Sequence, residues 1–132
     1  PGKEMPFLPL FNAAQQMHAG VKYLPFHGGQ GVRYLTQYAQ APLPINNNDL
    51  FYAYQGLSDD GKDYVAVVLP VSLSGLPASY QSVSQADMEA LATRFPAYID
   101  EITQKLNTQP DGSYKPSLAD LDALVKSIAV KP

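Results

Sequence analysis

The chain has 132 residues, of which 45% are hydrophobic, and it carries a formal net charge of −3. This length suits one domain with its own core, and the composition is typical of globular proteins. No cluster of Lys or Arg occurs, which argues against nucleic-acid binding, and no apolar run is long enough to span a membrane. Cysteine is absent, which excludes disulfides, thiolate metal sites and cysteine nucleophiles.

The first part of the chain predicts an irregular lead-in followed by a strand. Prolines in residues 1–10 disfavour a helix. Residues 11–17 are ambiguous between a helical turn and the start of a strand. Residues 18–26 alternate, with Ala19, Val21 and Tyr23 on one side, which predicts a strand with one face in water.

A glycine-rich turn and a second strand come next. Residues 27–31 contain three glycines, which supply the backbone angles of a tight reversal. Residues 32–40 then predict a strand that places Arg33 on one face and Tyr34 and Tyr38 on the other. The segment from 41 to 49 has two prolines and three asparagines, a composition typical of a loop.

Residues 50–71 predict a β-hairpin whose strands are joined by a turn at residues 58–61. Both faces of both strands are largely apolar, so we expect the hairpin to be central in its sheet and covered on both sides. Short reversals between successive strands indicate an antiparallel meander of four strands. The lead-in is a candidate fifth strand at the edge.

The last third of the chain predicts helices. Residues 84–107 carry apolar side chains at helical spacing, with Ser84 as the N-cap and Pro96 as a point of interruption. Residues 117–128 repeat the pattern, with Ser117 as the N-cap. We therefore predict an α+β fold in which residues 1–132 form a single domain, mainly sheet over residues 11–71 and helical over residues 84–128.

Two groups of residues could carry chemistry, and each also has a structural explanation. His18 and His27 could bind a metal or act as acid and base, but a nine-residue offset puts them on opposite sides of an ideal strand. We therefore expect two surface histidines. Asp59, Asp60 and Asp63 suggest a calcium loop, but Gly61 comes too early for one, and we favour a charged hairpin turn. No cofactor is expected, because motifs for nucleophiles and phosphate loops are absent.

Tyrosine is the aromatic residue of interest, since the chain has nine tyrosines and no tryptophan. Tyrosine combines an apolar ring with a hydroxyl and recurs at binding surfaces, although strands favour it in any case. The asparagines of residues 46–49 offer donors and acceptors for a sugar or an amide, or serve the turn alone. The predicted ligand-binding residues are Arg33, Tyr34, Tyr38, Tyr52, Tyr54, Asn46 and Asn47. Because neighbours in a strand alternate, Arg33 and Tyr34 cannot both face one site.

Residues 31–38, Asn46 and Asn47, residues 54–57 and residues 69–71 resemble, in this order, a domain of uncharacterised bacterial secreted proteins and lipoproteins. The closing segment, residues 113–128, is also similar, so the resemblance covers most of the chain. It implies an extracytoplasmic location and a single α+β domain, and it brings no activity. The first residues fit a chain trimmed after a signal or lipid-anchor segment, or a remnant of a tag.

Three functions are compatible with these observations. The first is a non-catalytic extracytoplasmic module that binds an unknown protein or a small polar ligand, without spanning a membrane and with a possible lipid anchor on a preceding segment. The second is a small hydrolase or metal-dependent enzyme that uses His18, His27 and nearby acids. The third is a structural domain that packs in a larger assembly.

Overall fold

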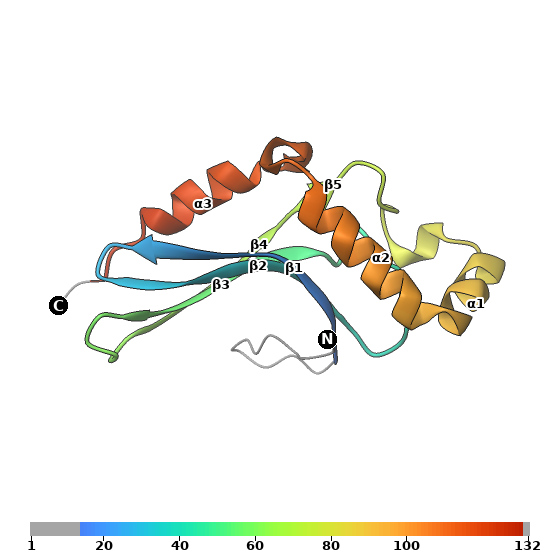
Figure 1. Cartoon of the computed structure of the whole chain (residues 1–132), viewed down its shortest axis with the longest axis horizontal. Helices are drawn as coiled ribbons and strands as arrows, with labels where there is room; N and C mark the ends of the chain where they lie inside the picture. The colour runs from blue at the N-terminus through green and yellow to red at the C-terminus, as the bar shows by residue number, and fades with distance from the viewer. Residues whose placement is uncertain (1–13, 131–132) are drawn as a thin grey trace.

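The computed structural model describes residues 14–130, and its centre is a four-stranded antiparallel sheet (Figure 1). The strand order along the sheet follows the sequence, which confirms the predicted meander. The fifth strand suggested for the lead-in falls outside the described residues. The strands are β1 (Ala14–Phe26), β2 (Gly29–Ala39), β3 (Phe51–Ser58) and β4 (Tyr64–Pro70).

The helices follow the sheet in sequence and confirm the α+β class. The first is α1 (Gln85–Thr93), which leads into α2 (Phe95–Thr108), and the last is α3 (Leu118–Lys126). Short elements connect them: β5 (Ser72–Leu73) pairs with β6 (Tyr114–Lys115), and two 3-10 turns, η1 (Tyr80–Ser82) and η2 (Asp111–Ser113), occupy the loops.

The helix boundaries lie where capping chemistry predicts them. The Ser84 hydroxyl accepts a hydrogen bond from the Asp87 N–H at 3.1 Å, and the Ser117 hydroxyl accepts from the Ala119 N–H at 3.2 Å. Pro96 lies in the first turn of α2, where its missing N–H costs no helical hydrogen bond. The predicted interruption at this proline is therefore confirmed.

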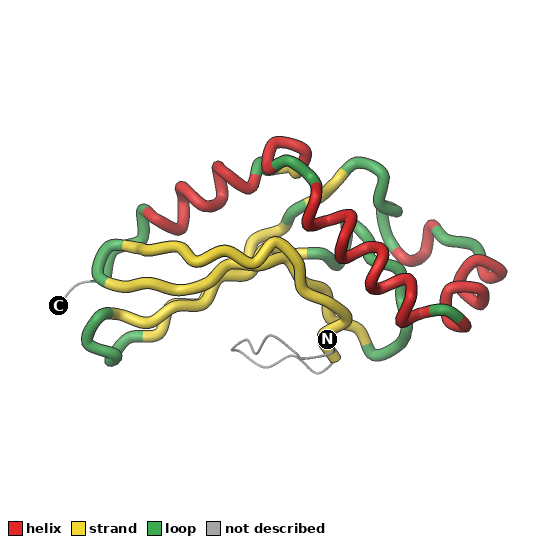
Figure 2. Tube along the Cα trace, viewed as in Figure 1, coloured by secondary structure: helices red, strands yellow, loops and turns green. Residues whose placement is uncertain are grey.

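Helices α2 and α3 lie on one side of the sheet, and no described helix lies on the other (Figures 1 and 2). We call the side with the helices the covered face and the opposite side the open face. The main core lies between the sheet and the helices. On the helix side it is built from Ile102, Leu106, Leu118, Leu121 and Val125.

The prediction that the hairpin is central and covered on both sides is wrong for β4. This strand is at the edge of the sheet, and its side chains alternate between half-buried and exposed. Tyr64 and Val68 on the open face are 44% and 48% exposed. The apolar composition of both faces of β4 therefore leaves hydrophobic side chains in solvent.

A bulge in β1 changes the alternation predicted for residues 18–26. The register with β2 shifts between Ala19 and Lys22, next to Gly20, whose φ is +63°. As a result Ala19 is buried whereas Tyr23 is 82% exposed. The prediction that these two side chains share a face is wrong, because the bulge adds a residue between them.

Candidate functional site

The predicted ligand-binding residues fall in three separate places. Arg33, Tyr52 and Tyr54 lie on the covered face, where each is at most 4% exposed. Tyr34 and Tyr38 lie on the open face, Tyr34 fully buried and Tyr38 half-buried and stacked on Phe51. Asn46 and Asn47 lie in the loop before β3. These residues therefore do not form a single surface, as the alternation of Arg33 and Tyr34 along β2 predicted. Five of them are buried: Arg33, Tyr34, Tyr52, Tyr54 and Asn46.

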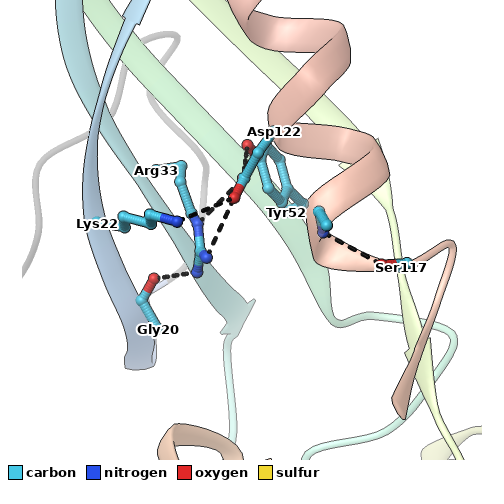
Figure 3. Close-up of polar contacts among 7 residues, drawn as sticks. Gly20, Lys22, Arg33, Tyr52, Ser117 and Asp122 are labelled. Carbon is cyan, nitrogen blue, oxygen red and sulfur yellow. Dashed lines mark hydrogen bonds and ion pairs between the residues drawn. The ribbon is translucent and has the colours of Figure 1, made fainter. Parts of the chain in front are cut away.

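Arg33 forms a buried polar cluster with Asp122 of α3 (Figure 3). The Arg33 Nε donates to Asp122 Oδ1 at 3.2 Å, and its Nη2 donates to Oδ2 at 3.4 Å. The Tyr52 hydroxyl donates to the same Oδ1 at 2.8 Å, and the Lys22 ammonium lies 3.8 Å from Oδ2. The carboxylate of Asp122 is thereby saturated by donors from β1, β2 and β3.

The third nitrogen of the Arg33 guanidinium, Nη1, binds the backbone at the bulge in β1. It donates to the carbonyl of Gly20, whose N–H donates to the Asn107 side chain of α2 at 2.7 Å. Since no buried side-chain nitrogen or oxygen among residues 14–130 lacks a partner, the cluster is complete without a ligand. Its role is to bind both helices to the sheet.

The asparagine loop is also internally satisfied. Asn46 is fully buried; its side chain donates to Pro44 O and accepts from the N–H groups of Asn48 and Asp49. The Asn47 amide accepts from the Leu73 N–H at 2.9 Å and donates to its carbonyl at 3.1 Å, as a paired strand would. Both side chains serve the loop in this structure.

The histidines are far apart along β1. His18 pairs with Thr36 in the sheet and is half-buried, and His27 is exposed at the opposite end of the strand. Nine residues of bent strand correspond to roughly 20–30 Å, too far for a shared ligand or proton transfer. Within residues 14–130 no group of three or more His, Asp or Glu side chains is arranged to hold a metal ion.

The acidic turn after β3 is held by its own hydrogen bonds. The Ser58 hydroxyl donates to Asp60 Oδ1 at 2.6 Å, and the Lys62 N–H donates to the same oxygen at 3.0 Å. These two bonds lower the pKa of the exposed Asp60 carboxyl. The turn reverses at Gly61, whose φ is +73°, which confirms the hairpin turn.

The open face contains a hollow of about 750 Å³ near the tip of the β3–β4 hairpin. Its floor crosses the strands, because the strand pairing places Val32 beside Gln55 and Gln30 beside Leu57. Tyr23 of β1 and Tyr64 of β4 stand on opposite edges of the sheet, and the two edge strands are about 14 Å apart, at three strand spacings. The Tyr64 hydroxyl donates to Gln55 Oε1 at 3.0 Å, which directs this ring toward the hollow.

The chemistry of this hollow is aromatic and amide-rich, with little charge. The backbone of Gly31 and Gly56 forms part of the floor, and Ser58 and Asp59 lie at one end. Among residues 14–130, no Lys or Arg lines the hollow, and Asp59 is the only carboxylate in its lining. Such a surface can stack flat apolar groups and hydrogen-bond hydroxyls or amides, and it does not favour anions.

Sequence reasoning missed the residues of the hollow because the bulge in β1 determines where Tyr23 points. Tyr64 was assigned to a covered strand, and Gln30 to a turn that the structure extends as strand from Gly29. The burial of Asp122, in contrast, could have been predicted from the sequence. This residue lies four residues after Leu118 and one after Leu121, on the apolar stripe of its helix, and an acid there requires a buried partner.

Burial on both faces gives the protein a marked sensitivity to alkaline pH. Burial raises the pKa of Tyr54 and of Tyr114 to about 12, and it raises the pKa of Tyr34 and Tyr52 as well, in Tyr52 with the hydrogen bond to Asp122. An unfolded tyrosine ionises near 10. The contribution of each buried ring to the stability of the fold is therefore fully present below about pH 10. It falls by about 1.4 kcal/mol per pH unit above that, until the pKa of the ring in the folded state is reached.

We expect cooperative unfolding between about pH 10 and pH 12. The measurement is a parallel titration by circular dichroism and by tyrosinate absorbance. The absorbance of the buried rings should rise together with the loss of secondary structure. Full ionisation of all nine tyrosines in a chain that keeps its native dichroism would contradict the burial described above.

The chain matches no protein-family profile, no curated protein and no solved structure. Between residues 14 and 130, no helix has the length and apolar character needed to cross a bilayer.

Proposed function

We propose that this protein is a non-catalytic, extracytoplasmic binding module, and that the hollow on the open face of its sheet binds a short uncharged saccharide. The observation that carries the proposal is the exposure of Tyr23. Its ring is 82% exposed at the rim of a hollow, where a large apolar side chain gains nothing for the fold. A ring held in this way can contact a ligand.

The chemistry of the lining supports a saccharide. A sugar ring presents an apolar C–H face and a rim of hydroxyls, which match a tyrosine face and the amides of Gln30 and Gln55. The described lining, within residues 14–130, contains no Lys or Arg, which argues against phosphate, nucleotide or acidic ligands. The amides on the floor argue against a purely apolar ligand.

Three further points support the proposal that the protein is non-catalytic and extracytoplasmic. The separation of His18 from His27 argues against their acting as a catalytic pair. Within residues 14–130, every buried polar side chain has a hydrogen-bond partner, including those of the cluster around Asp122, so none of them requires a substrate. The likeness of residues 31–38 and of residues 54–57 to bacterial secreted proteins and lipoproteins supports the extracytoplasmic location.

The proposal is tested on an array of neutral oligosaccharides, probed with the wild-type chain and with Tyr23→Ala. We expect the wild type to bind at least one saccharide. Tyr23→Ala should weaken that binding by about 1–3 kcal/mol, because the ring is a central contact, and leave the melting temperature unchanged, because the ring is exposed.

Tyr80→Ala is the matched control, since this ring is also solvent-exposed, at 39%, and lies outside the hollow. It should bind as the wild type does. A wild-type chain that binds no neutral saccharide, or a Tyr23→Ala variant with unchanged binding, would refute the proposal.

A further inference from the structure

The outer edge of β4 is a seven-residue strand without a described neighbour. Among residues 14–130, β3 is the only element that makes extensive contact with it. The opposite edge, β1, is protected: it has two register shifts, carries Lys22 and contacts α2 and α3. Bulges, lysines and covering helices are the usual protection of a sheet edge, and β4 (sequence YVAVVLP) has no charge and no bulge.

The pairing with β3 determines which backbone groups of β4 point outward. The Ser58 N–H donates to the Asp63 carbonyl at 2.9 Å, so these residues form a hydrogen-bonded pair at the base of the hairpin. Bonded and non-bonded pairs alternate along an antiparallel ladder. Tyr64, Ala66 and Val68 therefore direct their N–H and C=O groups away from β3. Pro70 also belongs to this outward-facing set, but it has no N–H to donate.

We infer that the edge of β4 binds β4 of a second copy of this chain, antiparallel and with Ala66 opposite Ala66 of the other copy. In this register Tyr64 lies opposite Val68 of the other copy, so every outward N–H of the three residues meets a carbonyl. A shift by one pair toward the C-terminal end would place Pro70 opposite Tyr64 and leave the Tyr64 carbonyl without a donor.

The side chains along the interface between the two β4 strands are complementary in the same register. On the open face, Tyr64 and Val68, which are 44% and 48% exposed in the single chain, cover each other. On the covered face, Val65 and Val67 lie opposite each other, and both are only half-buried in the single chain. The interface thus buries apolar surface on both faces of the sheet. In the dimer, the helices of both copies lie on the same side of one continuous eight-stranded sheet.

The inference goes beyond the proposed function, since it requires no ligand. One strand on each side makes a small interface, so we expect a dimer that dissociates in the micromolar range. The measurement is sedimentation of the whole chain across that range. The wild type should pass from monomer to dimer as its concentration rises, and a monomer throughout would overturn the inference.

Charge at Ala66 tests the register. Ala66 is exposed, so Ala66→Glu and Ala66→Lys should fold normally, as circular dichroism would verify. In the dimer each places like charges directly opposite, which should weaken self-association about tenfold or more. An equimolar mixture of the two should form a heterodimer visible by native mass spectrometry, and Ala66→Ser, the neutral control, should dimerise as the wild type does. Charged variants that self-associate normally, or a mixture that stays monomeric, would refute the pairing.

Discussion

Replacing Asp122 by alanine is expected to lower the free energy of unfolding by about 3–5 kcal/mol. The carboxylate is 4% exposed and accepts hydrogen bonds from Arg33 and from Tyr52. Without it, the guanidinium of Arg33 stays buried with one carbonyl partner, and the Tyr52 hydroxyl loses its acceptor. The measurement is urea denaturation of the variant and the wild type by circular dichroism.

Asp120→Ala is the matched control, because it removes the same group from an exposed position on α3. Its effect should stay below about 1 kcal/mol, the value of an acid in the first turn of a helix. Arg33→Met combined with Asp122→Leu and Tyr52→Phe should recover most of the loss, because it removes the three polar side chains from the core together. A loss under about 1 kcal/mol in Asp122→Ala would mean that the cluster does not hold the helix to the sheet.

Gly31→Ala is expected to destabilise the protein by about 3 kcal/mol or more, which exceeds the usual cost of overpacking. An added Cβ would lie 2.2 Å from the carbonyl oxygen of Gln55 and 2.6 Å from the Cα of Gly56. Both neighbours are backbone atoms of β3, so the strand itself must move away and lose hydrogen bonds of the ladder.

The control for this variant is Gly112→Ala. Nothing lies within 4 Å of the Cβ that it would add, and its φ is not in the left-handed region. We expect a change within about 0.5 kcal/mol. Equal stability of Gly31→Ala and the wild type would show that β2 and β3 do not approach as closely as described.

Local sequence signals were sufficient for most of the fold. The order of the strands followed from short reversals, and the ends of the helices followed from Ser84, Pro96 and Ser117. These features depend on neighbours in the chain, and a single sequence carries them directly. The apolar stripe predicted for α3 is confirmed in part. Leu118, Leu121 and Val125 are buried in the main core. Leu124, which was predicted to be buried with them, is 53% exposed.

The rest depended on contacts between distant segments. Composition alone could not distinguish an edge strand from a central one, since β4 is apolar on both faces although only one faces the core. The bulge at Gly20 depends on the carbonyl contact with Arg33 and on the hydrogen bond to Asn107, a residue far along the chain. For the same reason Tyr23, on which the candidate site depends, could not be assigned to the open face.

The central claim is that the covered face of the sheet stabilises the fold whereas the open face binds the ligand. The most direct test is a titration of isotope-labelled protein with the best saccharide from the array, followed by backbone amide chemical shifts. We expect the largest shifts at Gln30, Val32, Gln55 and Tyr64, and none at Asp122. Shifts concentrated in α2, α3 or the asparagine loop would contradict the account.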